Sequence, residues 1–172
     1  TAFGPVNEGS TYAMFKVEGT PGYSMDLAPQ SASSGTAAST ASFTYQFSTD
    51  GGTTWTTYDN SNKPTVPGGG SFFVRVNITS EADFDYEGAE TFALKASYTS
   101  NASKSATADT SMVDNGTGTK YDGSLTGGAP ASSTTGLDDD QPKPIVRPLP
   151  PAAPIAPAPA APEPVISPPQ AL

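Results

Sequence analysis

Apolar and polar residues alternate along several short segments of the chain, and a period of two residues is typical of β-strands. The alternation is clearest in residues 71–79 and 90–98. The apolar positions of these two segments, which we expect to face the core, are Phe72, Val74, Val76, Ile78, Phe92 and Leu94. Arg75 and Lys95 fall on the opposite face and are expected outside the core.

Further segments carry strand signals, and no window shows the apolar stripe with a period of 3.6 residues that a helix requires. These segments are residues 10–19, 23–28, 42–48, 54–58 and 104–113. Turn signals separate them, as in antiparallel sheets. We therefore predict an all-β fold, an antiparallel two-sheet β-sandwich of about seven strands. Its single tryptophan, Trp55, is expected in the core rather than on a sugar-binding surface.

Composition divides the chain into parts. All the aromatic residues lie at or before Tyr121, whereas residues 123–172 hold 13 of the 18 prolines. A segment without aromatic residues and rich in proline buries too little apolar surface to offset the entropy lost on ordering. We predict a β-sandwich over residues 1–122, a linker rich in Gly, Ser, Thr and Asp over residues 123–140, and an extended Pro-rich tail over residues 141–172.

Three roles fit the Pro-rich tail. Its composition favours polyproline II, a semi-rigid spacer or stalk that rises about 3.1 Å per residue. The run IVRPLPP contains the P-x-x-P pattern that aromatic grooves bind, although we favour the spacer over this ligand. The third role is an inter-subunit clasp, in which apolar side chains pack on a neighbouring copy. These side chains are Ile145, Val146, Leu149, Ile155 and Val165.

The composition also excludes several classes of function. The 172 residues include no cysteine and no histidine, so the chain has no disulfide, no zinc site of Cys and His ligands and no Ser-His or Cys-His nucleophile. We expect no enzyme. The net charge of −9 makes nucleic acid a poor partner, and no apolar run approaches the ~20 residues of a membrane-spanning helix. Because the chain opens without Met or a signal peptide, we expect it to be part of a longer polypeptide.

The most acidic stretch of the chain is residues 81–90, which hold five carboxylates and no base. These are Glu81, Asp83, Asp85, Glu87 and Glu90. Such charges repel one another unless a cation lies among them, and Ca²⁺ takes six to eight oxygens at flexible angles. The stretch is therefore either a calcium site or a solvated acidic loop. The run Asp138–Asp140 is likewise either a displaced part of such a site or the solvated start of a linker.

Several segments, in the family's order, resemble the Calx-beta repeat. VNEGSTYAMFKVEG (6–19) is similar to its opening strand, and ATADTSMVDNGTG (106–118) to its closing strand. VPGGGSFFVRVNI (66–78), followed by SEADFDYEGAETFALKASY (80–98), is similar to its central strands and acidic loop. The resemblance implies an Ig-like, seven-stranded sandwich that binds Ca²⁺ at one end. It also implies tandem arrays, as in sodium–calcium exchangers, cell-surface receptors and giant bacterial adhesins.

The resemblance further implies calcium ligands where residues match the family's motifs. These positions are Glu8 in the opening strand, Glu87 and Glu90 in the E-x-x-E pattern, and Asp114 in the closing motif. The family's closing run of aspartates is reduced here to Asp114–Asn115–Gly116. Glu81, Asp83 and Asp85 are candidates to take the place of the missing acids, and we expect one or two ions rather than a full cluster.

Together these features predict a structural repeat module, the last of a tandem array, in a secreted bacterial surface protein. Such a protein would be a Ca²⁺-stiffened adhesin or extracellular fibre of the kind found in biofilms, with the tail as stalk or clasp. The expected partners are neighbouring repeats or copies of the same protein. The alternative is a glycan- or protein-binding module that recognises a cell surface, with the Pro-rich segment as linker or ligand.

Overall fold

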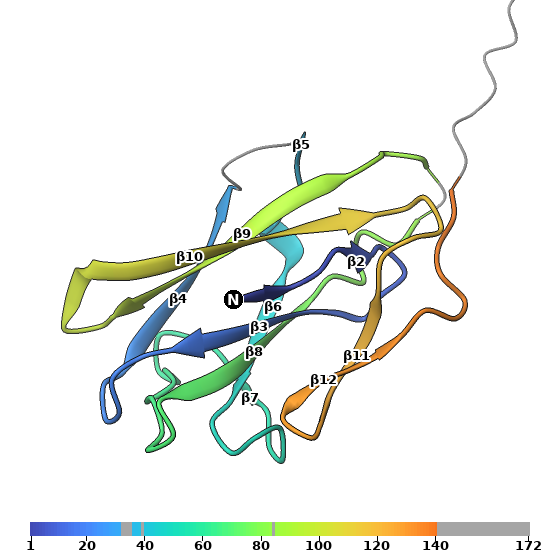
Figure 1. Cartoon of the computed structure of the whole chain (residues 1–172). Coiled ribbons are helices and arrows are strands. Elements are labelled where there is room, and N and C mark those ends of the chain that lie inside the picture. Colours follow the sequence, from blue (N-terminus) through green and yellow to red (C-terminus); the bar gives the residue numbers. More distant parts are fainter. Residues whose placement is uncertain (32–35, 39, 84, 141–172) are drawn as a thin grey trace, which may run out of the picture.

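The computed structural model describes residues 1–31, 36–38, 40–83 and 85–140. In these residues the fold is all-β, with two packed sheets (Figure 1) and one short 3₁₀ turn at Thr40–Ser42. The described part of the chain contains no helix that is long and apolar enough to cross a membrane. The predicted fold class is therefore confirmed at the level of an all-β protein built from two packed sheets.

The larger sheet has seven strands and the smaller sheet has five. The order in the larger sheet is β12 (Ala129–Ser133), β11 (Lys120–Thr126), β3 (Tyr12–Glu18), β8 (Ser71–Asn77), β6 (Thr44–Ser48) and β7 (Thr56–Thr57), and β1 (Ala2–Phe3) also pairs with β3. The order in the smaller sheet is β2 (Val6–Asn7), β10 (Asn101–Val113), β9 (Glu90–Tyr98) and β4 (Met25–Ser31), and β5 (Thr36–Ala37) also pairs with β9.

The first residues of the chain connect the two sheets. β1 runs antiparallel to β3 in the larger sheet, and β2 runs parallel to the end of β10 in the smaller one. Between them the backbone passes so close to β10 that a Cβ at Gly4 would lie 2.5 Å from Thr110 Oγ1. This crossing brings the residue after β2, Glu8, to the same end of the sandwich as the residue after β10, Asp114.

All seven segments predicted as strands form strands, and the predicted core residues are buried. Phe72, Val74, Val76, Ile78, Phe92 and Leu94 are all at most 3% exposed. Arg75 lies on the outer face, with its guanidinium 4.5 Å from the ring centre of Tyr12 and 4.3 Å from that of Trp55. Trp55 is only partly buried, so it packs at the margin of the core rather than inside it.

The prediction of a linker over residues 123–140 is wrong for the described structure. β11 and β12 form a hairpin there, and it joins the larger sheet through Tyr121 beside Tyr12. The Tyr121 amide donates to Ser10 Oγ at 2.7 Å, and Leu125 packs against the core. The few large side chains at the start of the hairpin therefore attach it, although most of its residues are small and polar. The predicted Pro-rich tail, residues 141–172, lies outside the described residues.

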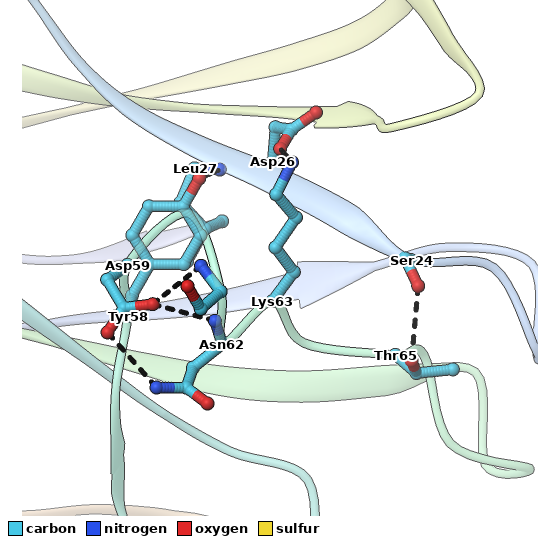
Figure 2. A network of polar contacts seen from close by, with 9 residues as sticks. Ser24, Asp26, Leu27, Tyr58, Asp59, Asn62, Lys63 and Thr65 are labelled. Atoms are coloured by element: carbon cyan, nitrogen blue, oxygen red, sulfur yellow. Dashed lines mark hydrogen bonds and ion pairs between the residues drawn. The ribbon is translucent and has the colours of Figure 1, made fainter.

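The outer edge of β4 is covered by the loop at residues 58–66 (Figure 2). The amide of Met25 donates to the Pro64 carbonyl at 2.9 Å, and the amide of Leu27 donates to the Tyr58 hydroxyl at 3.1 Å. Lys63 Nζ lies 2.7 Å from a carboxylate oxygen of Asp26. Edge strands expose unpaired backbone groups that can pair with another chain, and this loop binds the outward amides of Met25 and Leu27 in the first half of β4.

Candidate metal centre

Three connections and one later segment meet at one end of the sandwich. β2 ends at Asn7, β10 ends at Val113, and β9 begins at Glu90, so the residues just beyond these points share that end. The segment that follows β12 rises to the same place (Figure 1), where Asn115 and Asp139 form an antiparallel bridge. Acidic residues from four distant parts of the sequence therefore gather there.

Asp114 lies at the centre of this acidic end and is fully buried. Its Oδ2 accepts hydrogen bonds from the amides of Glu87, at 2.7 Å, and Gly88, at 3.0 Å. These bonds fix the acidic loop against the end of β10. Its other oxygen, Oδ1, is buried without a hydrogen-bond partner. A buried carboxylate oxygen without a partner is costly, since burial removes its water and nothing replaces it.

Glu8 is the second buried carboxylate of this end, with 4% of its surface exposed. Its Oε1 is also buried without a hydrogen-bond partner. Burial, and after it the negative charges of Asp114, Asp138, Asp83 and Glu87, raises the pKa of Glu8 to about 7. Glu8 and Asp138, 130 positions apart in the sequence, therefore lie close enough for the charge of one to act on the other.

Asn7 holds the pieces of the site together, and it is completely buried. Its Nδ2 donates to the carbonyls of Thr117, at 2.9 Å, and Asp138, at 3.0 Å. Its Oδ1 accepts from the amides of Gly9, at 3.1 Å, and Asp138, at 2.8 Å. Sequence reasoning missed this residue, and the only signal for it was its position beside Glu8 in the VNEG motif.

The run Asp138–Asp140 belongs to this site. The Gly116 amide donates to the Asp138 carbonyl at 2.9 Å, and the Asp140 amide donates to the Asp114 carbonyl at 2.7 Å. Asp140 Oδ2 is buried without a hydrogen-bond partner. Burial, followed by the charges of neighbouring acids, raises the pKa of Asp140. Of the two interpretations of this run, the structure favours the one that places it among the acids of the closing strand.

The remaining predicted ligands lie at the rim. Asp83, Asp85 and Glu87 are exposed, and Asp83 Oδ1 accepts the amide of Asp85 at 2.8 Å. Glu90, the first residue of β9, is half-buried. Burial, and then the charges of Glu87, Glu81 and Asp114, raises the pKa of Glu90. The seven candidate ligands, including the half-buried Glu81, thus lie at one end of the sandwich; Glu8 and Asp114 are buried and the others are partly or fully exposed.

The chemistry of this end fits a hard cation, although the acids are not arranged as a finished cage. Within the described residues, no three acidic side chains are grouped closely enough to hold a metal ion as they are placed. The donors are nevertheless all oxygens, the set that Ca²⁺ prefers. Three of the carboxylates, on Glu8, Asp114 and Asp140, keep a buried oxygen unpaired. The base Lys120 lies nearby, but its ammonium group donates to the Gly136 carbonyl, at 2.8 Å, rather than to one of these carboxylates.

Comparison of the chain with protein-family models, with curated proteins and with solved structures finds no match. The resemblance to Calx-beta repeats, and the functions that it implies, therefore stay predictions. The site described above rests on the residues of this chain alone.

Proposed function

We propose that the chain is a Ca²⁺-binding β-sandwich module of a secreted bacterial adhesin or extracellular fibre, in which the ion stiffens one end of the sandwich. The observation that carries the calcium site is the pair of buried carboxylates Glu8 and Asp114, each with an unpaired oxygen. Like charges buried together without a base oppose folding. A divalent cation between them removes this cost, and that is the reason for proposing one.

Each group of acids has its own part in this proposal. Glu8, Asp114 and Asp140 supply the buried oxygens, while Asp83 and Glu87 supply further oxygens from the exposed loop. The Asp114 hydrogen bonds to the amides of Glu87 and Gly88 hold that loop beside the buried acids. Ca²⁺ binding would therefore join the loop, the end of β10 and the run after β12 into one rigid unit, which is what a load-bearing joint requires.

The wider role rests on the resemblance to Calx-beta repeats and on the shape of the site. As in that family, the ion would sit at one end of the sandwich, where one module meets the next. The tail at residues 141–172 would then act as a stalk or as a clasp onto a neighbouring copy. The proposed module is Ig-like in its connections, since its first strand divides between the two sheets.

Thermal unfolding with and without Ca²⁺ tests the calcium site. At a free concentration 100-fold above its dissociation constant, Ca²⁺ should stabilise the fold by about 2.7 kcal/mol. For a fold of this size the melting temperature should rise by roughly 5–10 °C relative to EGTA. Mg²⁺ should have a smaller effect, because it demands near-octahedral geometry at shorter distances.

Matched variants locate the effect. Glu8→Gln should remove most of the Ca²⁺ response, and calorimetric titration with CaCl₂ should show weaker binding. Glu18→Gln is the control, since Glu18 is an exposed acid at the far end of β3, paired with Lys16 at 3.0 Å. Identical melting curves of the unsubstituted chain in millimolar Ca²⁺ and in EGTA would contradict the site.

One observation favours the alternative, a glycan- or protein-binding module. Tyr23 is half-exposed and packs edge-on against Tyr98, with ring centres 5.4 Å apart. Beside them is a hollow of about 250 Å³ that is also lined by Asn101 and Lys104. An exposed aromatic ring beside an amide and an ammonium group can bind a sugar. Retention of the chain on a glycan array, lost in Tyr23→Ala, would support this function.

A further inference from the structure

Within the described residues, β10 has no second neighbouring strand from Asn101 to Thr107. On one side it pairs with β9 from Asn101 to Met112. On the other side, β2 pairs with Met112 and Val113, and the backbone before β2 passes close to Thr110 at Gly4. The edge of β4, at the other side of the same sheet, is covered at Met25 and Leu27 by the loop at residues 58–66. The edge of the smaller sheet is therefore open to an added strand along the first half of β10.

The backbone groups at this edge point outward at alternate residues. The Glu8 amide donates to the Val113 carbonyl at 2.9 Å, so Val113 faces away from β9. The register with β9 is unbroken from Ser105 to Met112. Because successive residues of a strand turn their backbone groups to opposite sides, Ser105 and Thr107 face outward as Val113 does. Both residues are exposed.

An apolar cleft lies behind this edge, between the two sheets. Its volume is about 390 Å³, and its lining includes Phe15, Val17, Leu94 and Ala108. Lys16 and Lys104 also line it. Strand addition takes its affinity from backbone hydrogen bonds and its specificity from pockets for alternate side chains. The free edge and the cleft together provide both.

We propose that the free edge of β10 accepts an added strand from residues 141–150 of a second copy of the chain. This inference rests on the proposed function in one respect. The proposed clasp between subunits of the fibre needs a groove in which to dock, and the edge of β10 provides that groove. Fibre growth then follows from the geometry, because tail and groove are different surfaces, and such a heterologous contact repeats without closing unless its rotation forms a ring.

The spacing of the prolines in this segment fits an edge strand. They occupy even positions only, Pro142, Pro144, Pro148 and Pro150. An added strand needs its N–H groups on one side, and proline is tolerated where the N–H would face solvent. The odd positions keep their donors, and they are Gln141, Lys143, Ile145, Arg147 and Leu149.

Length and the overall charge of the chain agree with this occupant, while the charged residues that line the cleft itself are Lys16, Lys104 and Glu18. Of the 17 acidic residues only Glu163 follows Asp140, whereas two of the eight basic residues, Lys143 and Arg147, do. The segment is thus basic and the described part of the chain is acidic. Ten extended residues span about 33 Å, which is enough to cover β10 from Asn101 to Thr107. Residue 141 follows Asp140 at the end of β10, so copies stacked end to end bring the tail of one beside the cleft of the next.

Cysteine cross-linking tests the contact directly, because the natural chain has no cysteine. Single variants Ile145→Cys and Thr107→Cys (or Ser105→Cys) are mixed in Ca²⁺ and oxidised. We expect a disulfide-linked pair of the two different variants, and a ladder of multimers from a chain that carries both substitutions. Ser132→Cys, exposed on β12 at the edge of the other sheet, is the matched control and should not cross-link to position 145.

Removing one donor tests the pairing. Thr107→Pro deletes an outward N–H and leaves the ladder to β9, so monomer melting should stay within 2 °C while association weakens at least tenfold in sedimentation. Thr107→Val keeps the N–H and should associate normally.

The inference is overturned by unchanged association of Thr107→Pro, by no cross-link between copies, by a disulfide confined to one chain, or by pairing of Thr107→Cys chains with each other. The effect of Ca²⁺ on the melting temperature is measured in a separate experiment. If cross-links form but Ca²⁺ does not raise the melting temperature, the calcium site is contradicted and the docking groove on β10 is kept.

Discussion

Asn7 and Asp138 are joined by two hydrogen bonds across 131 positions of the sequence. Asn7 Nδ2 donates to the Asp138 carbonyl at 3.0 Å, and the Asp138 amide donates to Asn7 Oδ1 at 2.8 Å. The Asn7 side chain is completely buried. One amide therefore fastens the run after β12 to the end of β2, and it places the acids of that run beside Glu8.

Asn7→Ala should destabilise the fold by about 3 kcal/mol or more, because it leaves the buried backbone groups that Asn7 binds without partners. Urea denaturation in EGTA measures the cost. Asn60→Ala is the control, since Asn60 is exposed in a loop and its replacement should change stability by less than about 0.5 kcal/mol. A similarly small effect of Asn7→Ala would show that Asp138 is held by other contacts.

The strands of the core could be predicted because each carries its own alternation of apolar and polar residues. The additional strands could not. β1 and β2 have two residues each, which is too short for any period to show. In β11 and β12 most residues are Gly, Ser, Thr or Ala, so the pattern resembles a linker, and burial of Tyr121 and Leu125 is settled only by the packing of the whole sheet.

The candidate site could also be predicted in part, because some of its residues lie in short local motifs of the sequence. Glu8, Glu90 and Asp114 stand at the ends of strands, where a motif can mark them. Asn7 carries no signal of its own, since an asparagine beside a strand is common in turns. The place of Asp138 depends on contacts between residues 131 positions apart, and no local pattern contains that information.

Phe92→Ala should be one of the most destabilising single substitutions in the core. Phe92 is 1% exposed, and its ring packs edge-on against Phe43 and Phe15, with ring centres 5.1 and 5.9 Å apart. Loss of such a side chain costs ~3–5 kcal/mol through lost burial and the cavity left behind. Equilibrium unfolding measures this cost, and Tyr86→Ala, at an exposed aromatic residue, should cost far less. A cost below about 1 kcal/mol would contradict the core described here.

The loop over β4 should depend more on Tyr58 than on Lys63 (Figure 2). Tyr58→Phe removes the acceptor of the Leu27 amide, and the expected cost is about 1 kcal/mol. The Lys63–Asp26 ion pair is partly exposed, so Lys63→Ala should cost less than that. Hydrogen exchange of the Leu27 amide provides the local measurement. Faster exchange of this amide in Lys63→Ala than in Tyr58→Phe would show that the ion pair holds the loop more strongly than the Tyr58 hydrogen bond does.

In the absence of calcium, Glu8 should make the fold less stable as the pH rises. The unfolded chain releases the Glu8 proton near the ordinary pKa of 4.5, whereas the folded chain keeps it up to about pH 7. Between these values the folded state binds more protons, so its stability falls as the pH rises. The contribution is complete below about pH 4.5 and is lost as the pH rises through 7. A shift of this size corresponds to about 3 kcal/mol.

Unfolding in EGTA at several values between pH 5 and 8 measures this dependence. Asp140 and Glu90, whose pKa values are also raised, act in the same direction and remain in Glu8→Gln. The variant should therefore flatten the profile without abolishing its slope. It should also be more stable than the unsubstituted chain at pH 8, because the neutral amide avoids the repulsion by Asp114 and Asp138. Glu18→Gln should follow the original profile. Parallel profiles for the chain with and without Glu8→Gln would mean that Glu8 ionises in the folded state as it does in water, and that burial beside Asp114 costs it nothing.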